Sequence, residues 1–392
     1  MPSSWIIRSI FAFVMGLTVF STLGAGLSLG DAPASEDFLP DHPAAARNTA
    51  GLPVRIAVAP PKDPQFAHLS WNKALRTAKG TIVLTYIAGA FHGAHGGGCP
   101  AVSYSTDGGQ TFSEPNVLRQ FGPGRDYSCS GNLALGVAPD GAVVLLAMAY
   151  TGNESNHIFG WRSEDEGVSW TPVDTGTLGP NKTGSVFGNI LAVPGRGLLV
   201  FGHYRLGAQP YTSGIWMAAS ADSGRTWGLP RRISEVPAVE PLVLQVGSRL
   251  IGFFRGSDAL RGRQFVAISD DLCDTWKTEL SVLGPEDPNT SGLAAPFAVE
   301  NPGRPGEILV LTTERALAGS TPGRIWLWRG DAQHLDWRRD RVLLEFPRIP
   351  GDPHTDFGYP WLVPLENGRW LMFYYHGRKR GHCPIWVTEV TI

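Results

Sequence analysis

Side chains suited to acid–base chemistry and anion binding gather in the segments that separate apolar runs. Histidine exchanges protons near neutral pH, and arginine binds carboxylates through paired hydrogen bonds. Basic side chains outnumber acids in these segments, which predicts a basic concave surface for an anionic small ligand. The histidines are His68, His92, His95, His157, His203, His354, His376 and His382. The lysines and arginines are Lys182, Arg205, Arg255, Arg261, Arg263, Arg315, Arg378, Lys379 and Arg380. The acids are Asp126, Glu154, Glu240, Asp258, Glu314 and Asp356.

A repeated turn motif indicates the elements that would position these side chains. The pattern Ser-x-Asp-x-Gly-x-Thr/Ser-aromatic recurs around Asp107, Asp165 and Asp222, and imperfectly around Asp271, where Cys273 replaces the glycine. A fifth copy keeps little beyond its tryptophan. The aspartate and serine side chains can accept backbone N–H bonds, and the glycine allows a positive φ. Each copy therefore predicts a hairpin turn, which we call the aspartate turn.

A second repeat consists of two apolar strands joined by a glycine turn. Together with the aspartate turns it defines four-stranded units of about 58 residues, which match propeller blades. We predict an all-β, six-bladed β-propeller, with seven blades as the alternative. The last unit lacks an outer strand, which an N-terminal strand at 53–59 would supply to close the ring. The glycine turns are centred on Gly80, Gly141, Gly197, Gly247, Gly306 and Gly368.

The N-terminus has the pattern of an export signal. Arg8 precedes a mostly apolar stretch at 10–29, and Ala32-Pro-Ala34 resembles a cleavage site. We expect a signal peptide at 1–34, a linker at 35–53 and a single propeller domain at 54–392, in a secreted or periplasmic protein. An uncleaved anchor is the alternative, and no other membrane contact is expected.

Composition excludes other classes of protein. Apolar residues make up 43% of the chain and charged residues 17%, which excludes a disordered chain. The net charge of −2 argues against nucleic-acid binding. An exported chain can form disulfides, but sequence alone leaves their pairing open. The four cysteines are Cys99, Cys129, Cys273 and Cys383.

The aspartate turns, the six repeats and the export signal resemble the sialidase-like Asp-box (BNR-repeat) superfamily over nearly all of 54–392. The resemblance implies a catalytic base at Glu240, a carboxylate-binding arginine at Arg255 and a nucleophile at Tyr359. It also implies a second carboxylate-binding arginine in the fifth blade, where Arg315 or Arg324 could serve.

The sequence departs from this family at two places. The arginine that opens the first blade is absent, because this chain has Ser70-Trp71-Asn72-Lys73 there. The acid/base aspartate of the next loop is also absent, and His92 or His95 would have to replace it. Some similar propellers are uronate lyases with a catalytic histidine.

Three functions remain open at this stage. The first is a sialidase-like exo-glycosidase that cleaves a terminal acidic-sugar linkage of an oligosaccharide or polysaccharide. The second is a polysaccharide lyase that acts by β-elimination on a uronate glycan, for example of rhamnosyl-glucuronate or ulvan type, with a His or Tyr base. The third is a non-catalytic glycan-binding propeller. No cofactor is expected, although a structural or carboxylate-neutralising metal could use His92 or His95 with His68 or His376. Further candidate substrate-binding residues are His68, Trp71, Asn72, His203 and Arg378.

Overall fold

The computed structural model describes residues 46–93, 96–150, 156–178, 184–207, 212–257, 260–288, 291–316, 323–347 and 355–392. The predicted signal peptide, most of the predicted linker and His95 lie outside these residues. The described part contains no helix with the length and apolar character that a membrane span requires. A 3-10 turn, η2 (Pro64–Phe66), precedes the first blade.

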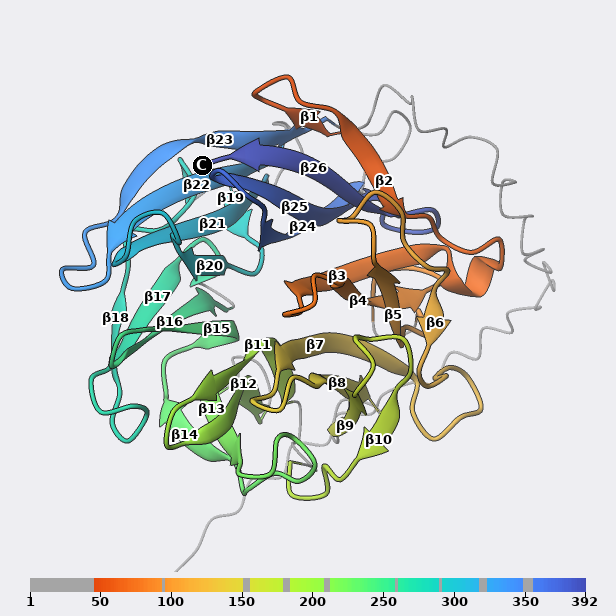
Figure 1. Ribbon diagram of the computed structural model, residues 1–392, viewed down its shortest axis with the longest axis horizontal. Coiled ribbons are helices and arrows are strands. Elements are labelled where there is room, and N and C mark those ends of the chain that lie inside the picture. The colour runs from red at the N-terminus through yellow and green to blue at the C-terminus, as the bar shows by residue number, and fades with distance from the viewer. Residues whose placement is uncertain are drawn as a thin grey trace, which may run out of the picture. The chain divides into compact units, whose positions relative to one another are not determined.

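The strands of the described residues form five sheets. Four sheets hold one blade each, and an eight-stranded sheet holds two blades that join where strands β7 and β11 pair in parallel. The protein is therefore a six-bladed β-propeller, as predicted from the repeats. Figure 1 shows the blades arranged around a common centre, which the innermost strand of each blade faces.

The strands are numbered in chain order, and each blade runs from the centre outwards. Blade 1 contains β3 (His68–Arg76), β4 (Ile82–Gly89), β5 (Cys99–Ser105) and β6 (Asn116–Val117). Blade 2 contains β7 (Cys129–Val137), β8 (Val143–Tyr150), β9 (Asn156–Ser163) and β10 (Thr171–Val173). Blade 3 contains β11 (Ser185–Val193), β12 (Gly197–Leu206), β13 (Thr212–Ser220) and β14 (Arg231–Ser234).

The remaining blades include strands from the N-terminus. Blade 4 contains β15 (Ala238–Val246), β16 (Arg249–Gly256), β17 (Gln264–Ser269) and β18 (Lys277–Leu280). Blade 5 contains β19 (Ser291–Leu293), β20 (Phe297–Glu300), β21 (Glu307–Ala316), β22 (Gly323–Asp331), β23 (Arg338–Phe346) and β1 (Arg47–Asn48). Blade 6 contains β24 (Thr355–Pro364), β25 (Arg369–Arg378), β26 (Ile385–Thr391) and β2 (Val54–Val58), and β2 pairs antiparallel with β26 at its outer edge.

The aspartate turns hold the third and fourth strands of a blade together. In the third copy, Asp222 Oδ1 accepts hydrogen bonds from the Ser220 hydroxyl at 2.8 Å and from the Thr226 backbone N–H at 2.9 Å. Its Oδ2 accepts the Thr226 hydroxyl at 2.6 Å. The copies at Asp107, Asp165 and Asp271 repeat this pattern.

A β-bulge interrupts the innermost strands close to the centre of the ring. In β3, β15 and β24 the register shifts at Ser70–Lys73, Val239–Pro241 and Gly358–Trp361. The bulges place Trp71, Glu240 and Tyr359 at positive φ values of 54°, 52° and 54°. Strands β7 and β11 also shift register, and blade 5 divides its inner strand into β19 and β20. Because a bulge redirects side chains, each blade can present residues to the centre without losing its outer pairing.

Apolar side chains pack between neighbouring blades. One cluster includes residues of the first blade and of the last three, for example Leu84, Phe253, Leu311 and Phe373, all buried. The four cysteines are buried and free, so the structure forms none of the disulfides that the sequence allowed. Packing and hydrogen-bonded turns, rather than covalent cross-links, therefore stabilise the ring.

Candidate active site

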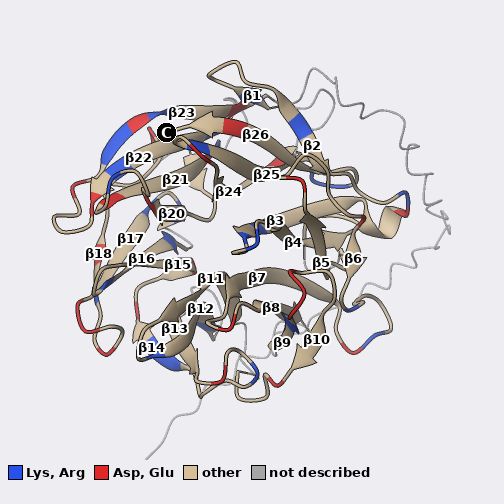
Figure 2. Ribbon diagram, viewed as in Figure 1, with Lys and Arg blue, Asp and Glu red and all other residues tan. Residues whose placement is uncertain are grey.

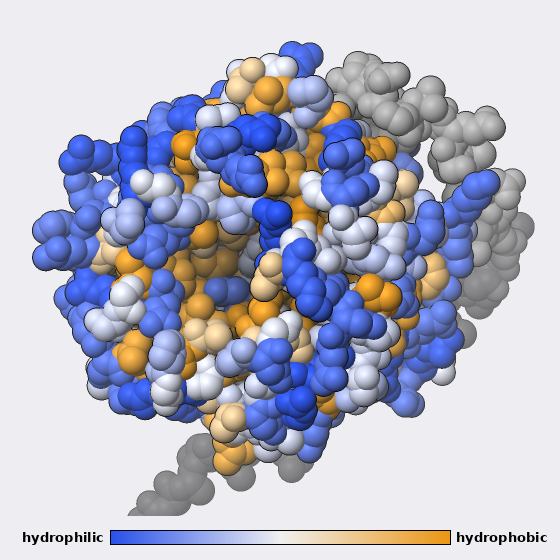
Figure 3. All heavy atoms as spheres, viewed as in Figure 1, coloured by the Kyte–Doolittle hydropathy of each residue, from blue (hydrophilic) through white to orange (hydrophobic). Residues whose placement is uncertain are grey.

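A pocket of about 470 Å³ opens at the centre of the ring, where Figure 3 shows a hollow among the surface atoms. Its walls come from the beginnings of inner strands and the ends of the strands that pair with them. Among the described residues that line it are four arginines and one acid, Glu240, which agrees with the predicted basic surface. Figure 2 shows basic segments near the centre. The lining residues are Trp71, His92, Gly93, Cys129, Gly131, Asn132, Tyr150, His203, Arg205, Val239, Glu240, Arg255, Gly256, Ser257, Arg261, Arg315 and Tyr359.

Tyr359 and Glu240 form a hydrogen-bonded pair on one wall of the pocket. The bulges in β24 and β15 bring the two side chains together, and the Tyr359 hydroxyl donates to Glu240 Oε1. Arg255, at the end of β16, donates from Nη1 to Glu240 Oε2 at 2.7 Å. The buried carboxylate thus has both oxygens bound, so the cost of burying its charge is offset.

The pKa values of Glu240 and Tyr359 are shifted in opposite directions. Burial alone would raise the pKa of Glu240, but Arg255 and the Tyr359 hydrogen bond outweigh it and bring the pKa to about 2. Burial and the Glu240 charge raise the pKa of Tyr359 well above its usual value. The resting state is therefore a neutral phenol that donates to an ionised carboxylate, as a nucleophile and its base require.

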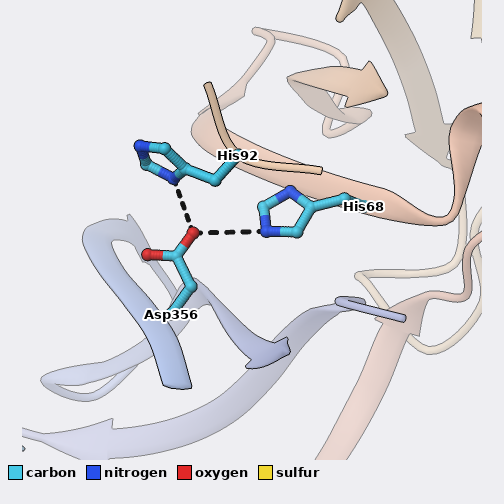
Figure 4. A group of neighbouring side chains, drawn as sticks. All are labelled: His68, His92 and Asp356. Carbon is cyan, nitrogen blue, oxygen red and sulfur yellow. Dashed lines mark hydrogen bonds and ion pairs between the residues drawn. The ribbon is translucent and has the colours of Figure 1, made fainter. Parts of the chain in front are cut away.

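His92, His68 and Asp356 form a second cluster, drawn in Figure 4. His92 Nδ1 lies 2.6 Å from Asp356 Oδ2, and His68 Nε2 lies 3.2 Å from the same oxygen. Burial alone would raise the pKa of Asp356, but the two histidines and Arg315 hold it well below its usual value. An ionised Asp356 fixes the His92 Nδ1 atom as a donor, and the Nε2 atom points away from Asp356.

Two further contacts define the place of His92. Its ring packs against the Trp71 side chain with centroids 4.3 Å apart. The side chain is 23% exposed, whereas His68 is 1% exposed. His92 therefore reaches the pocket, where its ring can exchange protons, while the buried His68 contacts the Asp356 carboxylate.

Arg315 lies between the two clusters, with its guanidinium carbon 6.0 Å from the centroid of the Tyr359 ring. Its Nε atom donates to the Phe357 carbonyl at 2.9 Å and its Nη2 atom to the Tyr375 hydroxyl at 2.6 Å. The same Nη2 atom lies 3.6 Å from Asp356 Oδ1. The guanidinium thus compensates the buried Asp356 charge while one side lines the pocket.

The His68, His92 and Asp356 ligand atoms lie within 4.8 Å of one another, a set that a divalent cation could use. The Arg315 guanidinium already supplies positive charge to this carboxylate. The carboxylate of this cluster therefore has a positively charged partner within the protein itself.

The structure places the other sequence-predicted residues in different environments. His203 lines the pocket, and its Nδ1 atom accepts the Glu240 backbone N–H at 3.4 Å. Asn72 is buried on β3 without lining the pocket. Arg324 lies on β22 and pairs with Glu286 at 3.1 Å, so of the two fifth-blade arginines only Arg315 lines the pocket. Arg378, at the end of β25, is not among the lining residues either.

Some residues of the site had no role in the sequence-based prediction. The sequence predicts Arg205 and Arg261 on this surface without a function for either, and it predicts Asp356 there without its histidine partners. Lys73 was noted only as a departure from a family motif. Arg205, Arg261 and Asp356 lie at or close to the ends of blade strands, which is a signal the sequence offers. Spacing alone cannot show which of several charged side chains turn toward one another.

By sequence, the chain matches no family model and no curated protein. By structure it is similar to a protein of unknown function from Dyadobacter fermentans, with a TM-score of 0.65, 18% identity, and coverage of 86% of this chain and 99% of the other. It is also similar to the NanB sialidase from Streptococcus pneumoniae, with a TM-score of 0.67, 13% identity, and coverage of 87% and 71%. The fold of this chain is therefore similar to that of a sialidase propeller.

A third neighbour extends this comparison. A Hadza microbial sialidase has a TM-score of 0.63 and 17% identity, and the match covers 86% of this chain and 68% of the other. At identities this low, the structural similarity to sialidases describes the fold alone, because one fold hosts many functions. The chemistry of this propeller depends on the side chains of its own pocket.

Proposed function

We propose that the protein is a secreted carbohydrate-active enzyme that cleaves a terminal acidic-sugar linkage of extracellular glycans, as a sialidase-like exo-glycosidase. The observation that carries the proposal is the hydrogen bond from Tyr359 to the ionised Glu240 inside a basic pocket. A phenol next to a carboxylate base is suited to attack an anomeric carbon that also bears a carboxylate, because a neutral nucleophile avoids charge repulsion.

Each bond change in the proposed reaction has an assigned group. Tyr359 Oη attacks the anomeric carbon while Glu240 accepts its proton, and the glycosidic bond breaks. His92 donates a proton to the departing sugar oxygen, and Asp356 stabilises the imidazolium from which that proton comes. Water then cleaves the tyrosyl–sugar bond, with His92 accepting the water proton and Tyr359 regaining its own from Glu240.

The arginines of the pocket supply the recognition of the acidic sugar. Guanidinium groups bind a carboxylate through paired hydrogen bonds. Arg255 and Arg315 are oriented by Glu240 and by the Phe357 carbonyl, so little conformational entropy is lost when a substrate binds them. The six-bladed ring and the pocket at its axis favour recognition of a chain end over the middle of a polymer.

A polysaccharide lyase is the second candidate, and the His92–Asp356 contact favours it. A histidine oriented by a carboxylate can remove the proton next to a uronate carboxylate that the arginines neutralise. Tyr359 would then protonate the 4-linked oxygen as the bond to it breaks and a carbon–carbon double bond forms. No water enters the product.

One screen separates the candidates. The purified protein is incubated with a fluorogenic sialoside and with uronate glycans, and fluorescence, reducing ends and ultraviolet absorbance are recorded together. Release of a saturated acidic sugar that is lost in Tyr359→Phe supports the hydrolase. An absorbance rise from an unsaturated uronate that is lost in His92→Gln refutes the hydrolase and supports the lyase. Glycan binding without either product would leave a binding propeller and refute both reactions.

A further inference from the structure

Lys73 is a buried lysine beneath the wall that carries Tyr359. It lies on β3 two residues after the bulge at Trp71, and its side chain is fully buried. The Nζ atom donates to the Trp71 carbonyl at 3.1 Å and lies 3.4 Å from the Asn72 carbonyl. Lys73 does not line the pocket, so a substrate bound there would not touch it.

Three aromatic rings surround the Lys73 ammonium. The Nζ atom is 4.1 Å from the centroid of Phe187 and 5.3 Å from the centroids of Tyr359 and Trp361. No ion pair joins Lys73 to a carboxylate anywhere in the described ranges, although Glu240 acts on it through space. Cation–π attraction to this cage therefore replaces the salt bridge that a buried lysine usually needs.

We propose that Lys73 is a positioning residue for the proposed reaction, and that its ammonium stabilises the negative charge that develops on Tyr359 when Glu240 takes the phenol proton. The inference rests on the proposed function. A cation at the face of the Tyr359 ring is attracted more strongly to a phenolate than to a phenol, so it lowers the barrier both to attack and to release of the tyrosine.

The ionisable groups near Lys73 and Tyr359 have different pKa values. Burial lowers the pKa of Lys73 to about 7, against the opposing charge of Glu240. Burial and Arg205 lower the pKa of His203 to about 3, whereas that of Glu240 is about 2. The pKa of Tyr359 is raised well above its usual range, and the pKa of Arg255 is also raised, by Glu240 against the opposing effect of burial. Lys73 is the member of this group whose charge changes near neutral pH.

The strands packed against β3 carry further ionisable side chains that keep one charge state there. Burial raises the pKa of the tyrosines and of the cysteine, and it lowers the pKa of His376 to about 4. All five are neutral around pH 7. They are Tyr86 on β4, Cys129 on β7, and Tyr374, Tyr375 and His376 on β25.

The first test measures the charge of Lys73 without any substrate. Melting temperatures of the wild type, Lys73→Met and the control Lys79→Met, which removes an exposed lysine, are compared between about pH 6 and about pH 9. Because the folded-state pKa lies below the unfolded-state value, the unfolded chain holds the proton more tightly, and wild-type stability rises with pH above about 7. The melting temperature of the wild type should rise relative to that of Lys73→Met as the pH increases across this range. The melting temperature of Lys79→Met should change with pH as that of the wild type does.

The second test measures the effect of that charge on turnover. We expect Lys73→Met to lower kcat by about 10- to 100-fold at pH 6, with KM unchanged, and to lose the fall in kcat that the wild type shows as Lys73 deprotonates. Lys73→Arg keeps its charge at all working pH values, so it should retain turnover at alkaline pH. The arginine variant separates the Lys73 proton from other titrating groups in the pocket.

Distinct results would overturn each part. A melting-temperature difference between wild type and Lys73→Met that is independent of pH would show that Lys73 does not titrate in this range. A Lys73→Met variant that folds and keeps the wild-type kcat and pH profile would refute the positioning role while leaving the proposed function intact. Failure of the wild type to cleave any glycan would refute the proposed function, and with it the role of Lys73 in that reaction.

Discussion

Arg315 connects the two halves of the pocket at the scale of single residues. Its contacts with the Phe357 carbonyl and the Tyr375 hydroxyl hold the guanidinium between Asp356 and the Tyr359 wall. The positive charge also opposes the rise in the pKa of Tyr359. A change on the histidine side is therefore expected to affect the nucleophile side as well.

Replacement of Asp356 by Asn tests how His92 is held. The amide is nearly isosteric but has no charge, so it can neither fix the His92 tautomer nor stabilise the imidazolium. We expect kcat to fall by about 100-fold or more, with a smaller change in KM. Steady-state kinetics on the substrate from the screen give both values. An Asp356→Asn variant with wild-type kcat would contradict the role of Asp356 in orienting and charging His92.

Replacement of Arg255 by Met tests the charge of Glu240. Without Arg255, burial dominates and the pKa of Glu240 should rise from about 2, because a buried carboxylate loses its counter-ion. The acidic limb of the kcat profile should move to higher pH, since Glu240 must be ionised to accept the Tyr359 proton. In the control Arg261→Met, which alters a pocket arginine outside this pair, the limb should stay in place even if KM rises.

Sequence reasoning identified one half of the site better than the other. Glu240, Arg255 and Tyr359 stand at positions that match the motifs of the family the sequence resembles, and the structure brings their side chains together. The partner of His92 could not be assigned, because Asp356 lies in another blade, 264 residues away in sequence. Lys73 was equally hidden, since a bulge determines which way it points and a one-residue insertion leaves no pattern in a single sequence.

At the scale of elements, the aspartate turns stabilise the outer part of each blade through short-range hydrogen bonds. Cys273 shows the limits of the motif, because it takes the place of the glycine at a φ of 90° and the turn still forms. The serine and aspartate contacts therefore matter more to this turn than the glycine does.

Replacement of Asp222 by Ala should destabilise the propeller by about 1–3 kcal/mol, because the turn loses several hydrogen bonds together. Chemical denaturation measures the change. The control is Asp270→Ala, which removes an exposed carboxylate paired with Arg249 and should cost less than about 1 kcal/mol. Equal losses in the two variants would contradict a structural role for the turn.

At the scale of the whole propeller, the ring is closed by a strand from the other end of the chain. β2 pairs with β26, and the Thr388 hydroxyl donates to the Pro53 carbonyl at 2.8 Å. Arg55 Nη1 donates to the Gln110 carbonyl at 3.1 Å, so β2 also contacts the first aspartate turn. Closure is thus made by β2 across the boundary between the last blade and the first.

Removal of β2 should therefore open the ring. A variant that begins at residue 60 loses the outer strand of blade 6, and we expect a drop in melting temperature of several degrees or loss of soluble protein. A variant that begins at residue 50 lacks β1 but keeps β2, and it serves as the control for the loss of β1 that both variants share. If both variants had the same melting temperature, the edge of the sheet at β26 would be stable without β2.

The whole-molecule prediction succeeded because a repeat can be counted. Six glycine turns and the short last unit were enough to expect six blades and a closing strand. The joining of blades 2 and 3 through β7 and β11 was not foreseen, because parallel pairing between neighbouring inner strands depends on how closely two blades approach.

Inner-strand bulges separate what a blade needs in order to fold from what it presents at the axis. Trp71, Glu240 and Tyr359 occupy extra positions in their strands, while pairing resumes on both sides of each. At such a bulge position one side chain can be exchanged for another while the sheet keeps its register. A ring built this way can acquire new chemistry by substitution at one bulge position at a time. It can retain its architecture while sequence identity to other propellers falls to 13–18%.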